Sequence, residues 1–140
     1  MKRMSISSAF AAALFITIAL PAPAFADLAA ETTAVWNRHV ERAMAGDLDA
    51  VMEDFAEDSV IITADGVIAG KDAIRKFFED FLAGFDQAAI ESTVVNAQTI
   101  HDDVVFSNFT IGTAGLTFQD TAVVRDDTIK VLTTVSYPQQ

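Results

Sequence analysis

The spacing of apolar residues predicts three helices in the first 85 residues. Within residues 31–45, positions i, i+3, i+4 and i+7 form one stripe: Trp36, His39, Val40 and Ala43. Gly46 is expected to end this helix, and the carboxylate of Asp47 can cap the start of a second one. The second helix repeats the helical spacing at Leu48, Val51, Met52 and Phe55. Residues 71–85 form a third helix, because their apolar residues keep to one face and their charged residues to the other.

Strand-forming residues dominate most of the rest of the chain. A short strand is expected at residues 59–63, before the turn signal Asp65-Gly66. Four more strands are expected, with short turns between them, at residues 90–100, 104–111, 116–125 and 128–136. Short connections favour an antiparallel meander. Helices followed by strands, without alternation, predict an α+β fold in which three N-terminal helices pack on one curved, mostly antiparallel sheet.

The first 26 residues have the features of an export signal. Two basic residues near the start precede an apolar run at residues 9–20 and the small-x-small site Ala24-Phe25-Ala26. The run is shorter than the roughly 20 residues that a membrane-spanning helix needs, and prolines follow it at once. We therefore expect a signal peptide at residues 1–26, cleaved before Asp27. Residues 27–140 should then form one domain in the periplasm or outside the cell, with no membrane attachment.

Composition limits the partners and the chemistry. Residues 27–140 hold all 20 acidic residues and seven of the nine basic ones, which gives a formal charge of 7 − 20 = −13. Such a surface repels phosphate backbones and anionic lipid, so neither nucleic acid nor a membrane is expected as a partner. The chain has no cysteine and two histidines, a poor set for a metal site. It has no nucleotide-binding glycine motif, and no cofactor is expected.

Several motifs and the order of the elements resemble the nuclear transport factor 2-like superfamily, and the SnoaL-like branch is the nearest. The motifs are Trp36, Ala45-Gly46-Asp47-Leu48, Phe55-Ala56-Glu57-Asp58, and Gly70-Lys71-Asp72-Ala73-Ile74 ahead of Phe77-Phe78. The resemblance covers residues 31–136. It implies a cone-shaped, cystatin-like fold with an interior pocket between sheet and helices, and pairing through the outer sheet face, so we expect a homodimer. It does not imply one activity, because members include isomerases, cyclases, dehydratases and binding modules.

Two polar residues are expected to face the interior. Asp120 alternates with apolar residues on its strand, and His39 belongs to the apolar stripe of the first helix. A buried carboxylate must be paired, hydrogen-bonded or protonated, so we expect His39 to be the partner of Asp120. The pair could act in general acid or base chemistry, or simply tie helix to sheet. Trp36, Thr63, Phe78 and Phe118 are expected to line the pocket, although a lone tryptophan on such a helix also fits a core position.

The chain also resembles the ketosteroid isomerase branch of the superfamily at the same elements. That branch has a tyrosine on the first helix, a base aspartate on the first strand and a second aspartate on a late strand. The resemblance places His39, Thr63 and Asp120 at these positions. Only the last keeps its residue type, and a threonine cannot replace the proton-abstracting carboxylate, so steroid isomerisation is not carried over.

Three functions remain open from the sequence. The favoured one is an exported domain that binds a small apolar molecule in the cone pocket without catalysis. The second is a cofactor-free acid/base enzyme of the isomerase, dehydratase or cyclase type that uses His39 and Asp120. The third is a dimeric protein-interaction module with a filled interior.

Overall fold

The computed structural model describes residues 24–139, so residues 1–23 of the expected signal peptide lie outside the described residues. The helices are α1 (Ala24–Met44), α2 (Leu48–Glu53), α3 (Lys71–Ala83) and α4 (Gln87–Glu91), with a short 3-10 helix η1 (Gly112–Ala114). The strands are β1 (Phe55–Thr63), β2 (Gly66–Ala69), β3 (Thr93–His101), β4 (Val104–Ile111), β5 (Leu116–Arg125) and β6 (Thr128–Pro138).

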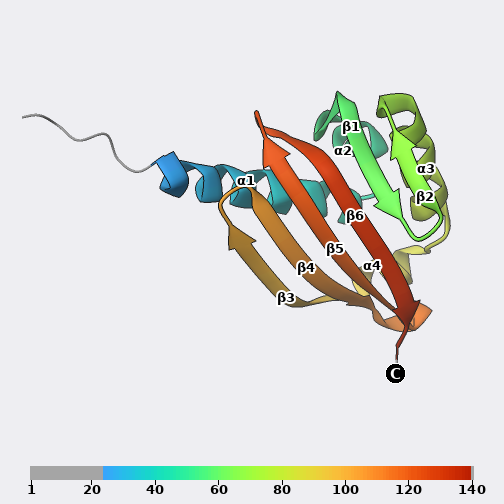
Figure 1. The fold of residues 1–140 in the computed structure, drawn as a ribbon. Coiled ribbons are helices and arrows are strands. Elements are labelled where there is room, and N and C mark those ends of the chain that lie inside the picture. The colour runs from blue at the N-terminus through green and yellow to red at the C-terminus, as the bar shows by residue number, and fades with distance from the viewer. Residues whose placement is uncertain (1–23, 140) are drawn as a thin grey trace, which may run out of the picture.

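The strands form one six-stranded sheet in the order β2-β1-β6-β5-β4-β3. Strand β1 runs parallel to β6, and all the other neighbouring pairs are antiparallel. The sheet is curved, and the long helix α1 crosses it behind β3, β4 and β5, while α3 lies beside the β1–β2 hairpin (Figure 1). The expected α+β fold, with helices packed on a curved and mostly antiparallel sheet, is confirmed.

Three elements differ from the sequence prediction. Phe55 was expected to continue the second helix, but that helix ends at Glu53 and Phe55 begins β1, where it pairs with Ile129 of β6. The unpredicted strand β2 pairs with β1 through the turn after Thr63. Residues 90 and 91 were expected in a strand, but they belong to helix α4, whose first turn is capped by the side chain of Asp86. In each case a tertiary or capping contact overrides the local pattern.

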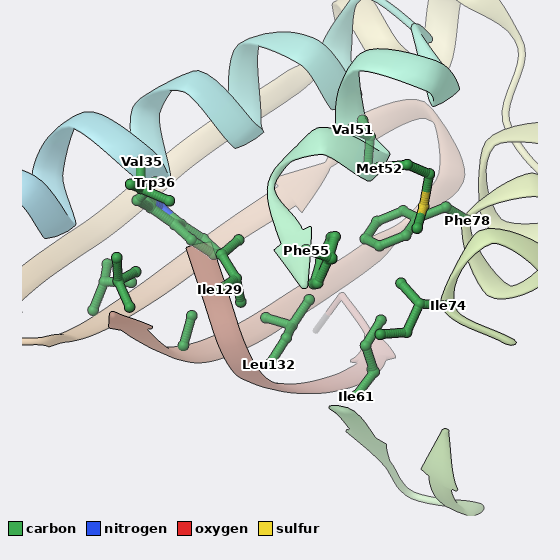
Figure 2. Packing of buried hydrophobic residues seen from close by; sticks show 13 residues of the cluster. Val35, Trp36, Val51, Met52, Phe55, Ile61, Ile74, Phe78, Ile129 and Leu132 are labelled. Atoms are coloured by element: carbon green, nitrogen blue, oxygen red, sulfur yellow. The ribbon is translucent and has the colours of Figure 1, made fainter. Parts of the chain in front are cut away.

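The main hydrophobic core joins the helices to the sheet. Trp36 of α1, Phe55 of β1 and Phe78 of α3 converge there with residues of α2 and β6 (Figure 2). Strand alternation decides which residues take part: Ile61 is fully buried, whereas the next residue, Ile62, is 37% exposed on the other face. A second cluster at the α4 end of the sheet contains Ala89, Ile111 and Phe118. The interior is therefore packed as two clusters rather than one.

Candidate functional site

A cavity of about 90 Å³ lies between α1, α3 and the helix-covered face of the sheet. Its walls come from both hydrophobic clusters and are rich in aromatic side chains: Trp36, Phe77, Phe78, Phe81, Phe109 and Phe118. Met44 and Val95 also line it and are 39% and 48% exposed, so the cavity reaches the surface on that side. The fold therefore offers a mostly apolar site that is open at one end.

His39 reaches this cavity from α1 and is only 5% exposed. Its ring packs among three aromatic rings, those of Trp36, Phe55 and Phe78, at centroid distances of 5.5, 5.5 and 5.6 Å. Its Nδ1 lies 3.5 Å from Oδ2 of Asp54, while the other ring nitrogen takes no part in this contact. Asp54 therefore lies next to one nitrogen of the ring and helps to fix its orientation.

Asp54 is fully buried where α2 meets β1, and the sequence analysis did not single it out. Its Oδ1 accepts hydrogen bonds from Arg38 Nε at 2.7 Å and from Arg42 Nη1 at 2.8 Å. Burial alone would raise the pKa of the Asp54 carboxyl, but His39, Arg38 and Arg42 together hold that pKa below its usual value. Asp54 is thus a buried anion with two cationic partners. The signal that could have revealed it is the pair of arginines at i and i+4 on the helix, on either side of His39.

The expected pairing of His39 with Asp120 is not what the structure shows. The carboxylate next to His39 is that of Asp54, and among residues 24–139 no basic side chain lies within 4.0 Å of the Asp120 carboxylate. The sequence pattern did not reveal Asp54, because only tertiary packing brings it next to α1. His39 and Asp120 nevertheless line the same cavity, so both polar side chains face one ligand-sized space.

Asp120 lies on β5 and is 9% exposed. Ser107 of β4 and Thr134 of β6 are its direct neighbours across the sheet, and both also line the cavity. One carboxylate oxygen, Oδ1, is buried without a hydrogen-bond partner among the described residues. Burial raises the pKa of Asp120 to about 6, against the opposing effects of the Thr134 hydroxyl and of the charge of His39.

The structure brings most of the other expected pocket residues to this cavity. Trp36, Phe78 and Phe118 line it, and each also belongs to a hydrophobic cluster, so lining the site and filling the core are the same role here. Thr63 does not line it. Its hydroxyl accepts a hydrogen bond from Asp65 N at 3.2 Å and donates one to Gly66 O at 3.3 Å, within the β1–β2 turn. It faces a neighbouring hollow of about 440 Å³, which Phe118 also lines.

The described residues do not gather a metal-type ligand set. No group of three or more histidine, cysteine, aspartate or glutamate side chains among residues 24–139 is placed to hold an ion. Within the same residues, no helix combines the length and apolar character needed to span a membrane.

Comparison with known proteins now places the chain. A family model described as the SnoaL-like domain matches residues 36–135. The chain belongs to the SnoaL-like domain family. The match spans the cavity, from Trp36 on α1 to Thr134 on β6. None of the curated proteins matches this SnoaL-like chain.

Solved structures agree on the fold. A proposed ketosteroid isomerase from Kribbella flavida superposes with a TM-score of 0.64 at 13% identity, over 80% of this chain and 82% of that one. A proposed polyketide cyclase from Sinorhizobium meliloti superposes with a TM-score of 0.59 at 19% identity, over 72% of this chain and 93% of that one. A de novo designed protein with a curved β-sheet superposes with a TM-score of 0.66 at 17% identity, over 78% of this chain and 87% of that one. The expected nuclear transport factor 2-like, cystatin-like fold of this SnoaL-like domain is confirmed, and at these identities the likeness extends to the fold alone.

The raised pKa of Asp120 predicts a pH-dependent stability difference between the SnoaL-like domain and its Asp120→Asn variant. A carboxyl whose pKa is higher in the folded state favours folding while it is protonated, and this contribution is lost as pH rises from 3.8 through about 6. Over this window the free energy of unfolding of the variant should therefore rise relative to that of the wild type by up to about 3 kcal/mol, since one pKa unit corresponds to 1.36 kcal/mol. Urea unfolding at a series of pH values measures the difference. Asp65→Asn, at an exposed turn, is the control for the loss of one charge. A constant difference across the window would contradict the prediction.

Proposed function

We propose that this SnoaL-like domain binds a small, largely apolar molecule in the cavity between α1, α3 and the sheet. The observation that carries the proposal is Oδ1 of Asp120, which is buried beside aromatic side chains and has no hydrogen-bond partner among residues 24–139. A buried polar atom without a partner is costly, and a ligand with one polar group would supply that partner. The export pattern of residues 1–26 supports action in the periplasm or outside the cell.

The size of the cavity favours a ligand of about one ring. Ligand pockets for drug-sized molecules usually measure roughly 300–1,000 Å³, whereas an engineered apolar cavity of about 150 Å³ already binds benzene. At about 90 Å³ the cavity suits a small ring or a branched alkyl group. Because Met44 and Val95 lie exposed at its border, a longer ligand could extend outward on that side.

A titration with benzyl alcohol tests this proposal. Trp36 is the one tryptophan of the chain and lines the cavity, so its fluorescence reports on occupancy. We expect saturable binding by the wild type and at least about a tenfold loss of affinity in Ala43→Leu, which extends a side chain into the cavity. Ala34→Leu makes the same change at an exposed position of the same helix and should bind like the wild type. Equal affinities in the two variants, or no saturation, would overturn the proposal.

Acid/base catalysis is the second candidate, and one specific arrangement favours it. His39 is oriented by a buried, ionised Asp54, and Asp120 lines the same cavity with its pKa raised to about 6. Two titratable groups in different environments facing one apolar site can serve as proton donor and acceptor. Isomerisation, dehydration and cyclisation are the reaction types that need no cofactor.

His39→Gln separates catalysis from binding. Glutamine fills a similar space without a titratable nitrogen, and Asp54 keeps its two arginine partners. If the domain is an enzyme, ligands identified by titration should be converted by the wild type, as followed by NMR, and conversion by the variant should fall at least about a hundredfold, as expected for the loss of a general acid or base. Binding by the variant should persist. Conversion that continues unchanged in His39→Gln, or its absence in the wild type, argues against catalysis by this pair.

We also propose that the domain forms a homodimer through the outer face of its sheet. Phe106, Val135 and Tyr137 are 37%, 39% and 38% exposed on this face. The cross-strand rows that contain them hold only uncharged partners: Thr121, Thr133, Asn108, Gln119, Thr110 and Thr117. Two copies whose residues 27–140 each carry a charge of 7 − 20 = −13 repel one another over most of their surface, so an uncharged face is the one suited to self-association.

Phe106→Glu should convert such a dimer into a monomer, because it places two like charges in the interface. Sedimentation velocity measures the change. Ala34→Glu adds the same charge at an exposed position of α1, on the helix-covered side of the sheet, and should leave the dimer intact. A wild-type protein that sediments as a monomer at high concentration would contradict the homodimer.

A further inference from the structure

The carboxylate of Asp120 lies in the middle of a polar row across three strands. Ser107 on β4 and Thr134 on β6 are its register partners, and all three side chains line the cavity. Adjacent strands lie about 4.8 Å apart, so two hydroxyls flank the carboxylate at that spacing. The row presents three oxygen acceptors to the cavity, and Oδ1 of Asp120 has no hydrogen-bond partner among residues 24–139.

The other walls of the cavity carry almost no charge. Helix α3 contributes only phenylalanine rings, and α1 contributes His39 as the one titratable group that faces Asp120. The nearest arginines, Arg38 and Arg42, are held by Asp54 and do not line the cavity. Among the described residues no lysine or arginine lines the cavity, and Asp54 already faces one nitrogen of His39, whereas Asp120 offers a cationic ligand a buried negative charge.

The aromatic side chains also favour a cationic ligand. Phe81 and Phe118 pack edge to face at 5.7 Å, and Phe109 stacks on Phe118 at 5.1 Å, so ring surfaces border the space around the polar row. The faces of aromatic rings attract cations, most strongly where water is excluded.

We infer that the ligand of this cavity is an amine, bound with its ammonium group on Asp120 between Ser107 and Thr134 and with its apolar part against the phenylalanine rings. An ammonium group has three N–H donors, which matches the three acceptors of the row. A neutral hydroxyl would satisfy one of them and leave the buried charge uncompensated. This inference rests on the proposed ligand-binding function of the same cavity and adds the charge of the ligand.

Three matched probes test the inference: benzylamine, benzyl alcohol and benzoate share one ring and differ in charge. With the full chain at about pH 7.5, where benzylamine is cationic and Asp120 ionised, Trp36 fluorescence should show benzylamine binding about tenfold or more tightly than benzyl alcohol. Benzoate should bind more weakly than either. The Asp120→Asn variant should bind benzylamine no more tightly than it binds benzyl alcohol.

The pH dependence of the wild type gives a second measurement that needs no variant. Benzylamine affinity should fall as pH is lowered through about 6, because protonation of Asp120 removes the negative charge. Benzyl alcohol should show no such fall.

The outcomes separate this inference from the function on which it rests. If benzyl alcohol binds as tightly as benzylamine, the inferred preference for an amine is wrong, but the proposed binding of apolar molecules in this cavity is supported. If benzoate binds most tightly, the inferred charge has the wrong sign. If none of the three probes saturates, both the inference and the proposed function fail.

Discussion

Asp54 joins three parts of the fold at one buried point. Its side chain accepts from Arg38 and Arg42 of α1, its Oδ2 faces His39, and its backbone carbonyl accepts from Ile129 of β6 at 2.8 Å. Because these contacts act on one fully buried residue, they fix how far along the sheet α1 lies and which way it is rotated. The apolar stripe of α1 then faces the sheet, and His39 reaches the cavity. Removing one member of such a buried charge network costs far more than an exposed ion pair contributes.

The cavity follows from the way in which the core is divided. Trp36 and Phe78 belong to the main cluster, whereas Phe109 and Phe118 belong to the second one, and the open space lies where the two meet. Asp120 lies at this boundary, with hydroxyl-bearing neighbours on both adjacent strands. A carboxylate in either cluster itself would have only apolar contacts. At the boundary, the flanking hydroxyls and the nearby imidazole lessen the cost of its burial.

The sequence predicts the fold better than it predicts the site. Alternation along β5 correctly oriented Asp120 inward, and helical spacing correctly oriented His39, since both periods are local properties of the backbone. The partner of His39 could not be found in this way. Asp54 follows α2 directly, and only tertiary packing brings it to Arg38 and Arg42, which lie 16 and 12 residues earlier in the chain. The same limit explains Phe55, whose spacing fits a helix but whose backbone pairs with Ile129.

The last strand of the chain, β6, occupies an interior position of the sheet. It pairs with β5 on one side and, in parallel, with β1 on the other, and it is the only described strand that connects the β1–β2 hairpin to β3, β4 and β5. Until residues 128–138 are in place, the sheet consists of two separate pieces, and the contact between β1 and β6 closes a loop of more than half the domain. Parallel pairing between distant segments is slow to form, so the domain completes its sheet only after residues 128–138 have been synthesised. The order of elements along the chain thus couples assembly of the sheet to the synthesis of β6.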